Sequence, residues 1–328
     1  MFMVVRAGIL TFCLMAMLGI EVQSAEKPHE ISKTEFGAEY SDGSSTISGD
    51  SALFTPKDGF ILLKVDSGRP VDRAASTLQA RYGYAITYED PPYTNGDDLQ
   101  DVSAKVVRNY WAYPHWVAPK VIVPRGGALT LHLPTSSHID SQGLDAILQQ
   151  LVRAQANSPR GGRFRIEQAG DVFHVIPTEV RDQHGNWSAI APLLDVLISL
   201  PTQSRSYEEL IEAVCKAVSA ATRIEMLPGA GTGGFGIFGS TVGPKRYVLG
   251  SNHEPARRVL DRILSAVEGD RGRLSWVLLY SPEPTRGSYY LNILPIPAEV
   301  QGTESTNPRL TPVPGRPHER SSGTGIQH

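Results

Sequence analysis

The stretch LDAILQQLVRAQANSPRGGRFRIEQAGDVFHVIP, residues 144–177, carries the strongest local pattern in the chain. Its first apolar residues recur at the spacing of one helix face: Leu144, Ile147, Leu148, Leu151 and Val152. Proline and glycine at 159–162 end that pattern, and alternation over 163–167 is typical of a half-buried strand. Turn residues at 169–171 then lead to a second strand that ends at Pro177. The stretch predicts an amphipathic helix followed by a β-hairpin.

The same pattern returns near the C-terminus. Residues 144–148 and 260–264 share their leucines, isoleucine and aspartate, and the closing Val175-Ile176-Pro177 is echoed by Ile293-Leu294-Pro295. A second pair of helices repeats one apolar spacing: Val71, Ala74, Ala75, Leu78 and Tyr82 in the first, and Tyr207, Leu210, Ile211, Val214 and Val218 in the second. Each has a strand-like run before and after it. We interpret the chain as a duplication of one strand-helix-strand, strand-helix-hairpin unit.

The pattern predicts an α+β fold of two tandem βαβ-βαββ units, each a small sheet with helices packed on one face. The predicted divisions are a signal peptide (1–25), a disordered leader (26–58), a first domain (59–178) with an insertion at 89–123, a second domain (192–297) and a disordered tail (298–328). We place the domain boundary in the polar segment around Trp187.

The N-terminus predicts export. Arg6 precedes a short apolar run, and small residues near Ser24 and Ala25 suit cleavage. The 328 residues carry a formal charge of −3, which does not favour a nucleic-acid partner. Cys13 lies in the signal, so the mature chain would keep Cys215, which we interpret as a buried hydrophobe. We expect a periplasmic or extracellular protein with no membrane span after the signal is removed.

The first unit resembles the short N-terminal domain (STN) shared by secretins and TonB-dependent outer-membrane receptors. The likeness is carried by PVDRAASTLQARYG at 70–83 with the strand at 85–88, and by the helix and hairpin of 144–176. The second unit resembles a more diverged copy. The link between strand and helix is longer here than in that family, and no barrel sequence follows in this chain. The resemblance implies an interaction module and implies no catalytic residue.

Two groups of residues have the types that occur in cofactor or metal sites. Gly229–Gly234 matches the glycine spacing of a dinucleotide loop, but the glycines that follow resist a helix, so we predict no cofactor. His115, His132 and His138 lack the paired spacing of metal ligands, and we predict no metal site. No motif assigns a catalytic residue.

The most suggestive candidates are Tyr110, Trp111, Tyr113 and Trp116, as a possible partner-binding surface. The alternative interpretation is that the insertion folds back and buries these rings on the sheet. We therefore expect an exported, non-enzymatic binding or assembly module of the cell envelope, whose partner is an envelope protein or glycan. The alternatives are a structural spacer, or a divergent envelope enzyme acting on glycan or peptide with groups in 89–123. A pocket holding Asp97, Asp101 and His115 together would favour the enzyme.

Overall fold

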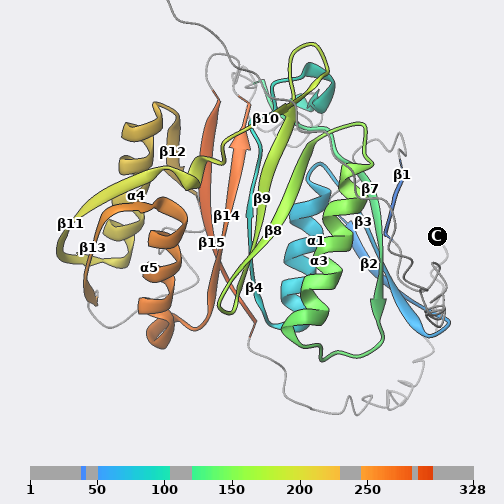
Figure 1. Ribbon diagram of the computed structural model, residues 1–328, viewed down its shortest axis with the longest axis horizontal. Coiled ribbons are helices and arrows are strands. Elements are labelled where there is room, and N and C mark those ends of the chain that lie inside the picture. The colour runs from blue at the N-terminus through green and yellow to red at the C-terminus, as the bar shows by residue number, and fades with distance from the viewer. Residues whose placement is uncertain (1–37, 42–50, 104–119, 230–244, 283–286, 298–328) are drawn as a thin grey trace, which may run out of the picture.

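The computed structural model describes residues 38–41, 51–103, 120–229, 245–282 and 287–297. Sheets and helices alternate along the longest axis (Figure 1). An outer sheet, a helix pair, a central sheet, a second helix pair and a second outer sheet follow one another. The predicted α+β class is confirmed, and each helix pair does pack on one face of its small sheet. A second sheet also covers the other side of each pair.

The first unit contains seven elements in the predicted order. They are β3 (Phe60–Ser67), α1 (Pro70–Tyr82), β4 (Ala85–Glu89), β7 (Gly127–Pro134), α3 (Ser141–Ala156), β8 (Gly162–Ala169) and β9 (Val172–Arg181). Strands β3 and β7 pair antiparallel in the outer sheet. On the other side of the helices, β9 pairs parallel with β4 and antiparallel with β8. The helix start of α3 is fixed by Asp140, whose side chain accepts a hydrogen bond from the Gly143 N–H.

The second unit repeats this order and this pairing. Its elements are β11 (Leu197–Ser206), α4 (Tyr207–Thr222), β12 (Glu225–Pro228), β13 (Arg246–Pro255), α5 (Ala256–Arg271), β14 (Leu274–Ser281) and β15 (Ser288–Pro295). Strand β11 pairs antiparallel with β13, and β15 pairs parallel with β12 and antiparallel with β14. The second unit therefore has the topology of the first.

The ends of the first helix in each unit correct the alignment made from spacing. Gly83 after α1 and Arg223 after α4 both adopt the left-handed conformation, with φ of 72° and 61°. When these caps are matched, Tyr82 corresponds to Thr222 and not to Val218. The spacing match was wrong by one helical turn, because a helical apolar pattern looks nearly the same after a shift of one turn. The extra turn of α4 lies at its start.

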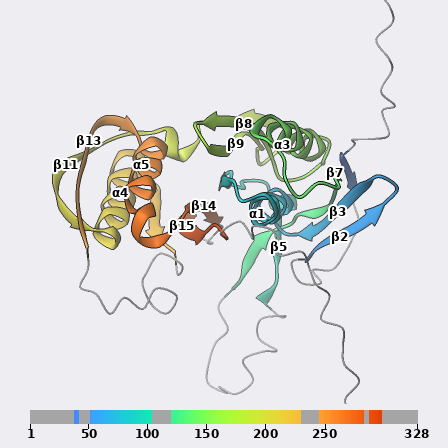
Figure 2. The ribbon, with the colours of Figure 1, turned by 90° about the horizontal axis from the view of Figure 1, so that it is seen from below.

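The two units share one central sheet. Its order is β10 (Trp187–Ala189), β9, β4, β14, β15, β12, with β8 on the outer side of β9. Strands β4 and β14 pair parallel where Tyr88 meets Val277 and Glu89 meets Leu278. The two helix pairs lie on opposite sides of this sheet (Figures 1 and 2). Equivalent strands of the two units run in opposite directions, and their helix pairs lie on opposite faces of the sheet. The units are therefore related by a half-turn about an axis that lies in the sheet and crosses its strands, combined with a shift along that axis.

Two apolar clusters correspond to the two units. One gathers residues from β3, α1, β4, β7, α3 and β9, and the other gathers residues from β11, α4, β12, α5, β14 and β15. Strand β14 contributes to both: Trp276 and Leu278 belong to the second core, whereas Val277 belongs to the first. Successive side chains of a strand point to opposite faces, so one strand can serve two cores. The joint between the units is thus built into the sheet.

Several segments add to this plan. Strands β1 (Ala38–Ser41) and β2 (Ser51–Lys57) lie inside 26–58, where the sequence predicts a disordered leader. Strand β1 pairs with β7, and β2 pairs with β3. The composition of residues 26–58 does not predict these pairings. The predicted signal peptide and tail fall outside the described residues. Within the described residues, no helix has both the length and the apolarity needed to cross a bilayer.

Candidate functional site: a cleft between the two units

The predicted aromatic surface lies outside the described residues, but its base lies inside them. The short strands β5 (Leu99–Asp101) and β6 (Ile122–Pro124) pair antiparallel on either side of the segment. Asp98, just before β5, is fully buried and accepts hydrogen bonds from Arg181 Nη2 at 2.7 Å and from the Gly161 N–H at 3.0 Å. The two ends of the 104–119 segment are therefore held together on an anchored base.

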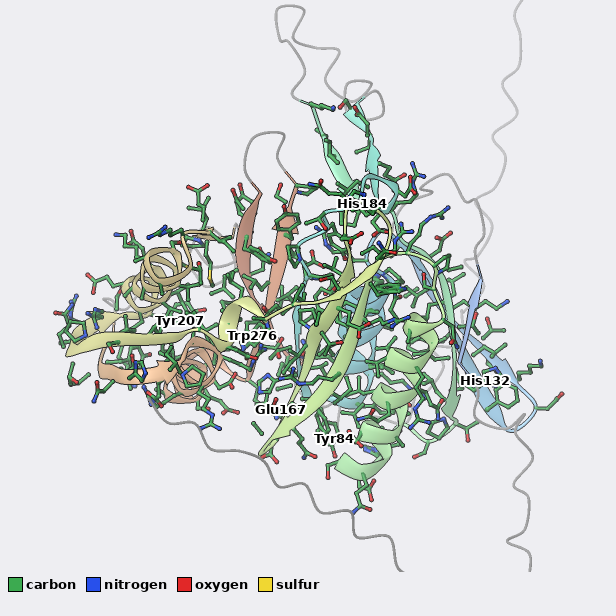
Figure 3. The ribbon with its side chains drawn as sticks, turned by 45° about the horizontal axis from the view of Figure 1, so that its top comes forward. Tyr84, His132, Glu167, His184, Tyr207 and Trp276 are labelled. Atoms are coloured by element: carbon green, nitrogen blue, oxygen red, sulfur yellow. The ribbon has the colours of Figure 1, made fainter. Side chains whose placement is uncertain are left out.

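The other predicted candidates do not converge. Asp97 and Asp101 are exposed and line no described pocket, and His115 falls outside the described residues. His132 stacks on Phe60 in an outer sheet, with ring centroids 4.7 Å apart. Figure 3 shows it well away from Glu167, Tyr84 and Trp276. In the glycine-rich loop, 230–244 lies outside the described residues. Across the described chain, no three His, Cys, Asp or Glu side chains gather as metal ligands would.

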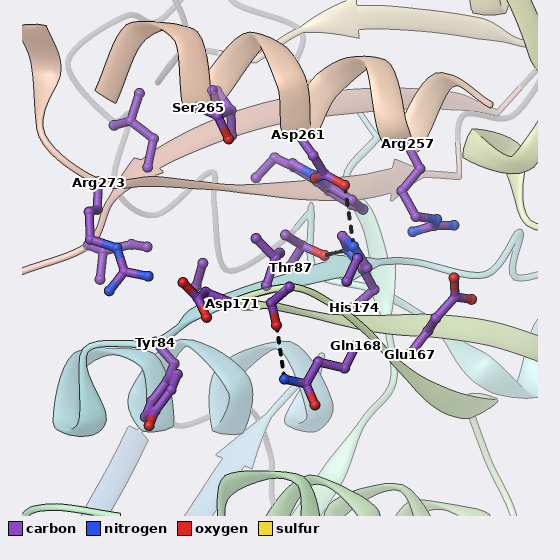
Figure 4. Close-up of a pocket in the computed structure, with 18 of the residues that line it drawn as sticks. Tyr84, Thr87, Glu167, Gln168, Asp171, His174, Arg257, Asp261, Ser265 and Arg273 are labelled. Carbon is purple, nitrogen blue, oxygen red and sulfur yellow. Dashed lines mark hydrogen bonds and ion pairs between the residues drawn. The ribbon is translucent and has the colours of Figure 1, made fainter. Parts of the chain in front are cut away.

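The structure instead forms a cleft between the units, with a volume of about 1510 Å³. Its floor is the face of β8, β9 and β4 that α1 and α3 do not cover, and its wall is α5 (Figure 4). The lining also includes Gly272, Arg273, Ile296 and Pro297 from the second unit and Tyr84, His138 and Ile139 from the first. Both units are needed to form it, so neither domain alone would carry this site.

A chain of hydrogen bonds crosses the inner part of the cleft from one unit to the other (Figure 4). Thr87 Oγ1 lies 2.7 Å from His174 Nδ1, and His174 Nε2 lies 3.3 Å from Asp261 Oδ2. Trp276 donates its indole N–H to Asp261 Oδ1 at 3.0 Å and stacks on the His174 ring. All bonds are satisfied when the Thr87 hydroxyl donates to Nδ1 and Nε2–H donates to Asp261. The chain thereby fixes α5 against the floor.

This hydroxyl, imidazole and carboxylate sequence has the residue types of a nucleophilic triad. Thr87 and His174 are each 1% exposed, however, and the hydroxyl also lies 3.5 Å from the Phe173 carbonyl oxygen. A substrate carbonyl carbon cannot reach a nucleophile that neighbouring atoms enclose. The Cys215 side chain is also buried, and this burial raises the pKa of its thiol to about 12. In this geometry the hydrogen-bonded Thr87, His174 and Asp261 join the two units, and the enclosed Thr87 hydroxyl does not attack a substrate.

One end of the cleft is built on ion pairs. Arg257 Nη2 donates to Glu89 Oε2 at 2.7 Å and to Asp195 Oδ1 at 3.0 Å. Glu89 also accepts hydrogen bonds from the N–H groups of Leu193 and Leu194. Burial raises the pKa of Glu89, and the Arg257 guanidinium and these N–H groups offset part of that rise. These contacts tie β4, the 193–195 turn and α5 together.

Charges of both signs face the cleft. Among its described lining residues, five are arginines and five are carboxylates: Arg165, Arg257, Arg258, Arg262 and Arg273, with Glu167, Asp171, Asp195, Asp261 and Glu268. A site for a polyanion or a polycation would show an excess of the opposite sign. The balance favours a ligand that is neutral overall or that carries both signs.

Sequence reasoning missed this cleft. His174 and Asp261 were placed in the two matched stretches, but nothing local shows that they face each other. A polar His at the centre of an otherwise apolar strand, 172–176, was the available signal, because a buried polar side chain needs a partner. Its partner comes from 87 residues further along the chain. Searches against protein-family models, curated proteins and solved structures find no match to this chain.

Proposed function

We propose that this protein is an exported, non-enzymatic binding or assembly module of the cell envelope, and that its partner binds in the cleft between the two units. The observation that carries the proposal is the cleft itself. It is open, ten charged side chains line it, both units contribute to it, and the Thr87 hydroxyl and the His174 imidazole are enclosed and hydrogen-bonded. Such a site favours binding over group transfer.

The resemblance to the STN family agrees with a binding role, since that family acts through contacts. The signal-like N-terminus supports the envelope as the place where the protein works. Fixed geometry also supports binding, because a preorganised site loses less entropy when a partner is bound. The ion pair between Arg257 and Glu89 and the link between His174 and Asp261 supply that rigidity.

The aromatic segment is proposed as a second contact. Tyr110, Trp111, Tyr113 and Trp116 lie between residues that are hydrogen-bonded to each other: the Val102 N–H donates to the Val121 carbonyl oxygen at 2.9 Å, and the Ser103 hydroxyl oxygen accepts from the Val121 N–H at 2.8 Å. An anchored base limits the entropy lost when a loop contacts a partner. The anchored base therefore supports a role for the segment in partner contact.

The test is a pull-down from envelope extract with the mature protein as bait. We expect a specific partner, protein or glycan, to be retained by the wild type and lost when the cleft charges are reversed in Arg258→Glu with Glu167→Arg. The matched control is Lys216→Glu on α4, which reverses an exposed charge outside the described cleft lining.

A second arm replaces Trp111 and Trp116 with alanine and reports on the aromatic contact separately. A partner retained equally by every variant would contradict the cleft assignment, and no partner above the empty-resin background would contradict the binding function. Fractionation of cells together with N-terminal sequencing tests export, for which we expect cleavage near Ser24 or Ala25.

A further inference from the structure

We propose that residues 298–308 of this chain lie in the cleft, extended along α5, where they compete with the partner. This inference rests on the proposed function and concerns the regulation of the same site. Its starting point is the position of the last described residues. Ile296 and Pro297 line the cleft, and the Ile296 N–H donates to the Arg273 carbonyl oxygen at 2.9 Å, just after α5 ends. The segment that follows Pro297 therefore begins at the cleft.

The wall and the floor of the cleft differ in charge. On the wall, the lining residues of α5 together with Arg273 comprise four arginines and two carboxylates. The floor, with the 193–195 turn, carries three carboxylates and one arginine: Glu167, Asp171, Asp195 and Arg165. An acidic segment is therefore attracted to the wall and repelled by the floor. Residues 298–308 contain Glu299 and Glu304 and no Lys, Arg, His or Asp, so their charge suits the wall.

Arg258 is the arginine of this wall that is open to a new contact. It is exposed, and none of the described residues forms an ion pair with it, whereas the other three wall arginines are each paired with a carboxylate. Arg258 precedes Arg273 by fifteen residues, which is about 22 Å at the rise of a helix. Glu304 follows Pro297 by seven residues, which is about 23 Å in extended chain. An extended segment that starts beside Arg273 therefore brings Glu304 to Arg258.

The cleft has room for a chain segment. Its volume of about 1510 Å³ exceeds the roughly 300–1,000 Å³ of ordinary small-ligand pockets. The sixteen residues of α5 form a wall about 24 Å long, which about seven extended residues span. The polar composition of 298–308 predicts no fold of its own, and such a segment takes its shape from the surface that binds it.

The covalent connection at Pro297 makes a weak contact sufficient. An exposed ion pair contributes little by itself. A segment that is joined to the protein next to its site has an effective concentration on the order of millimolar. A contact with a Kd on the order of 1 mM is then occupied about half of the time. The segment therefore excludes weak partners from the cleft, and a partner that binds more tightly displaces it.

The test measures disulfide formation in the full mature protein between Ser265→Cys on α5 and Gln301→Cys in the segment. Ser265 is exposed and faces the cleft (Figure 4). Ser265 lies about 12 Å along the helix from Arg273, and Gln301 lies about 13 Å along an extended chain from Pro297, so the proposal places them opposite each other. Cys215 does not compete, because burial raises the pKa of its thiol to about 12.

The charge dependence of the rate is the decisive readout. We expect Glu304→Arg to slow disulfide formation about threefold or more, because attraction to Arg258 becomes repulsion. Adding Arg258→Glu to that variant should restore the rate to within about twofold, since the exchanged charges attract again. The matched control is Glu319→Arg, which makes the same change of charge beyond residue 308 and should leave the rate unchanged. Loss of thiols over time and gel mobility under non-reducing conditions give the rates.

Three results would overturn the inference. Equal rates with and without Glu304→Arg would show that the covalent connection alone brings residue 301 to Ser265. A disulfide that forms only between molecules would assign the cleft to the segment of a second copy. Absence of the disulfide would place the segment outside the cleft. The pull-down decides the proposed function separately, and there Glu304→Arg as bait should retain more partner than the wild type; equal retention would exclude competition.

Discussion

Asp90 shows how single residues hold the two units together. Its carboxylate is fully buried, and it accepts from Arg69 Nε at 2.6 Å and from the Tyr280 N–H at 2.9 Å on one oxygen. The other oxygen accepts from the Tyr88 and Tyr93 hydroxyls at 2.7 and 3.2 Å. Burial and the nearby Asp90 charge raise the pKa of both tyrosines. Asp90 falls within the predicted insertion at 89–123, and only its tertiary partners give it a structural role.

We expect Asp90→Ala to reduce the free energy of unfolding by about 3–5 kcal/mol, because the change leaves the partly buried Arg69 guanidinium and two buried tyrosine hydroxyls without their carboxylate partner. Equilibrium denaturation in urea measures the loss. Glu212→Ala is the control, since it removes an exposed i,i+4 pair with Lys216 and should cost less than about 0.5 kcal/mol. Equal losses in the two variants would contradict the role assigned to Asp90.

At the scale of elements, β8 and β14 are equivalent strands with different tasks. Each is the first strand of a hairpin and contains eight residues, and they end at Ala169 and Ser281. When these two last residues are aligned, Arg165 of β8 corresponds to Val277 of β14. Val277 is 5% exposed and packs in the first core, whereas Arg165 is exposed to the cleft. Strand β14 thus forms the joint between the units, whereas its equivalent β8 lies at the edge of the sheet.

This difference predicts opposite tolerance at the two positions. Val277→Arg should reduce the free energy of unfolding by more than about 2 kcal/mol, because a charge would be buried where the units meet. Arg165→Val should change it by less than about 0.5 kcal/mol, since that side chain is exposed. Thermal denaturation of the two variants side by side provides the comparison. A larger loss for Arg165→Val would refute the assignment of joint and edge.

At the scale of the whole molecule, the joint determines the cleft. The half-turn between the units places α5 over the open face of β8 and β9, so the second unit supplies a wall for the floor of the first. Glu89 lies at the centre of this arrangement, bonded to Arg257 of α5 and to the turn at Leu193. Changes in its charge should therefore be measurable in the stability of the assembled molecule.

The raised pKa of Glu89 fixes the direction of a pH effect. The folded state binds the proton more tightly than the unfolded chain does, so the stabilisation from this group is complete below its ordinary pKa of 4.5 and is lost as pH rises through the folded value. The free energy of unfolding of the wild type minus that of Glu89→Gln should fall over the pH range that begins near 4.5 and extends above it. Denaturation curves across that range measure it, with Glu212→Gln as control. A difference that rises with pH would show that the carboxylate is favoured in its ionised form.

The sequence by itself determined the elements that depend on neighbours along the chain. Apolar spacing located α3 and α5, alternation and turn residues located the β8–β9 hairpin, and the recurrence of Leu144–Leu148 as Leu260–Leu264 indicated two units of one topology. Cys215 is buried, as its place on a helix face predicted. These features follow from side-chain periodicity, which is a local property. The local patterns did not predict the strands β1 and β2, because these strands are stabilised by pairing with strands elsewhere in the chain.

Only the tertiary structure decided how the units meet, and with that the cleft. Tyr88 pairs with Val277, and His174 approaches Asp261, across long stretches of chain that carry no local sign of these contacts. The alternation of β8 and the nearly continuous apolar run of β14 distinguish an open strand from one covered on both faces, but they do not show which distant strand pairs with β14. Burial between distant segments made that choice, because it depends on which faces remain after each unit has folded.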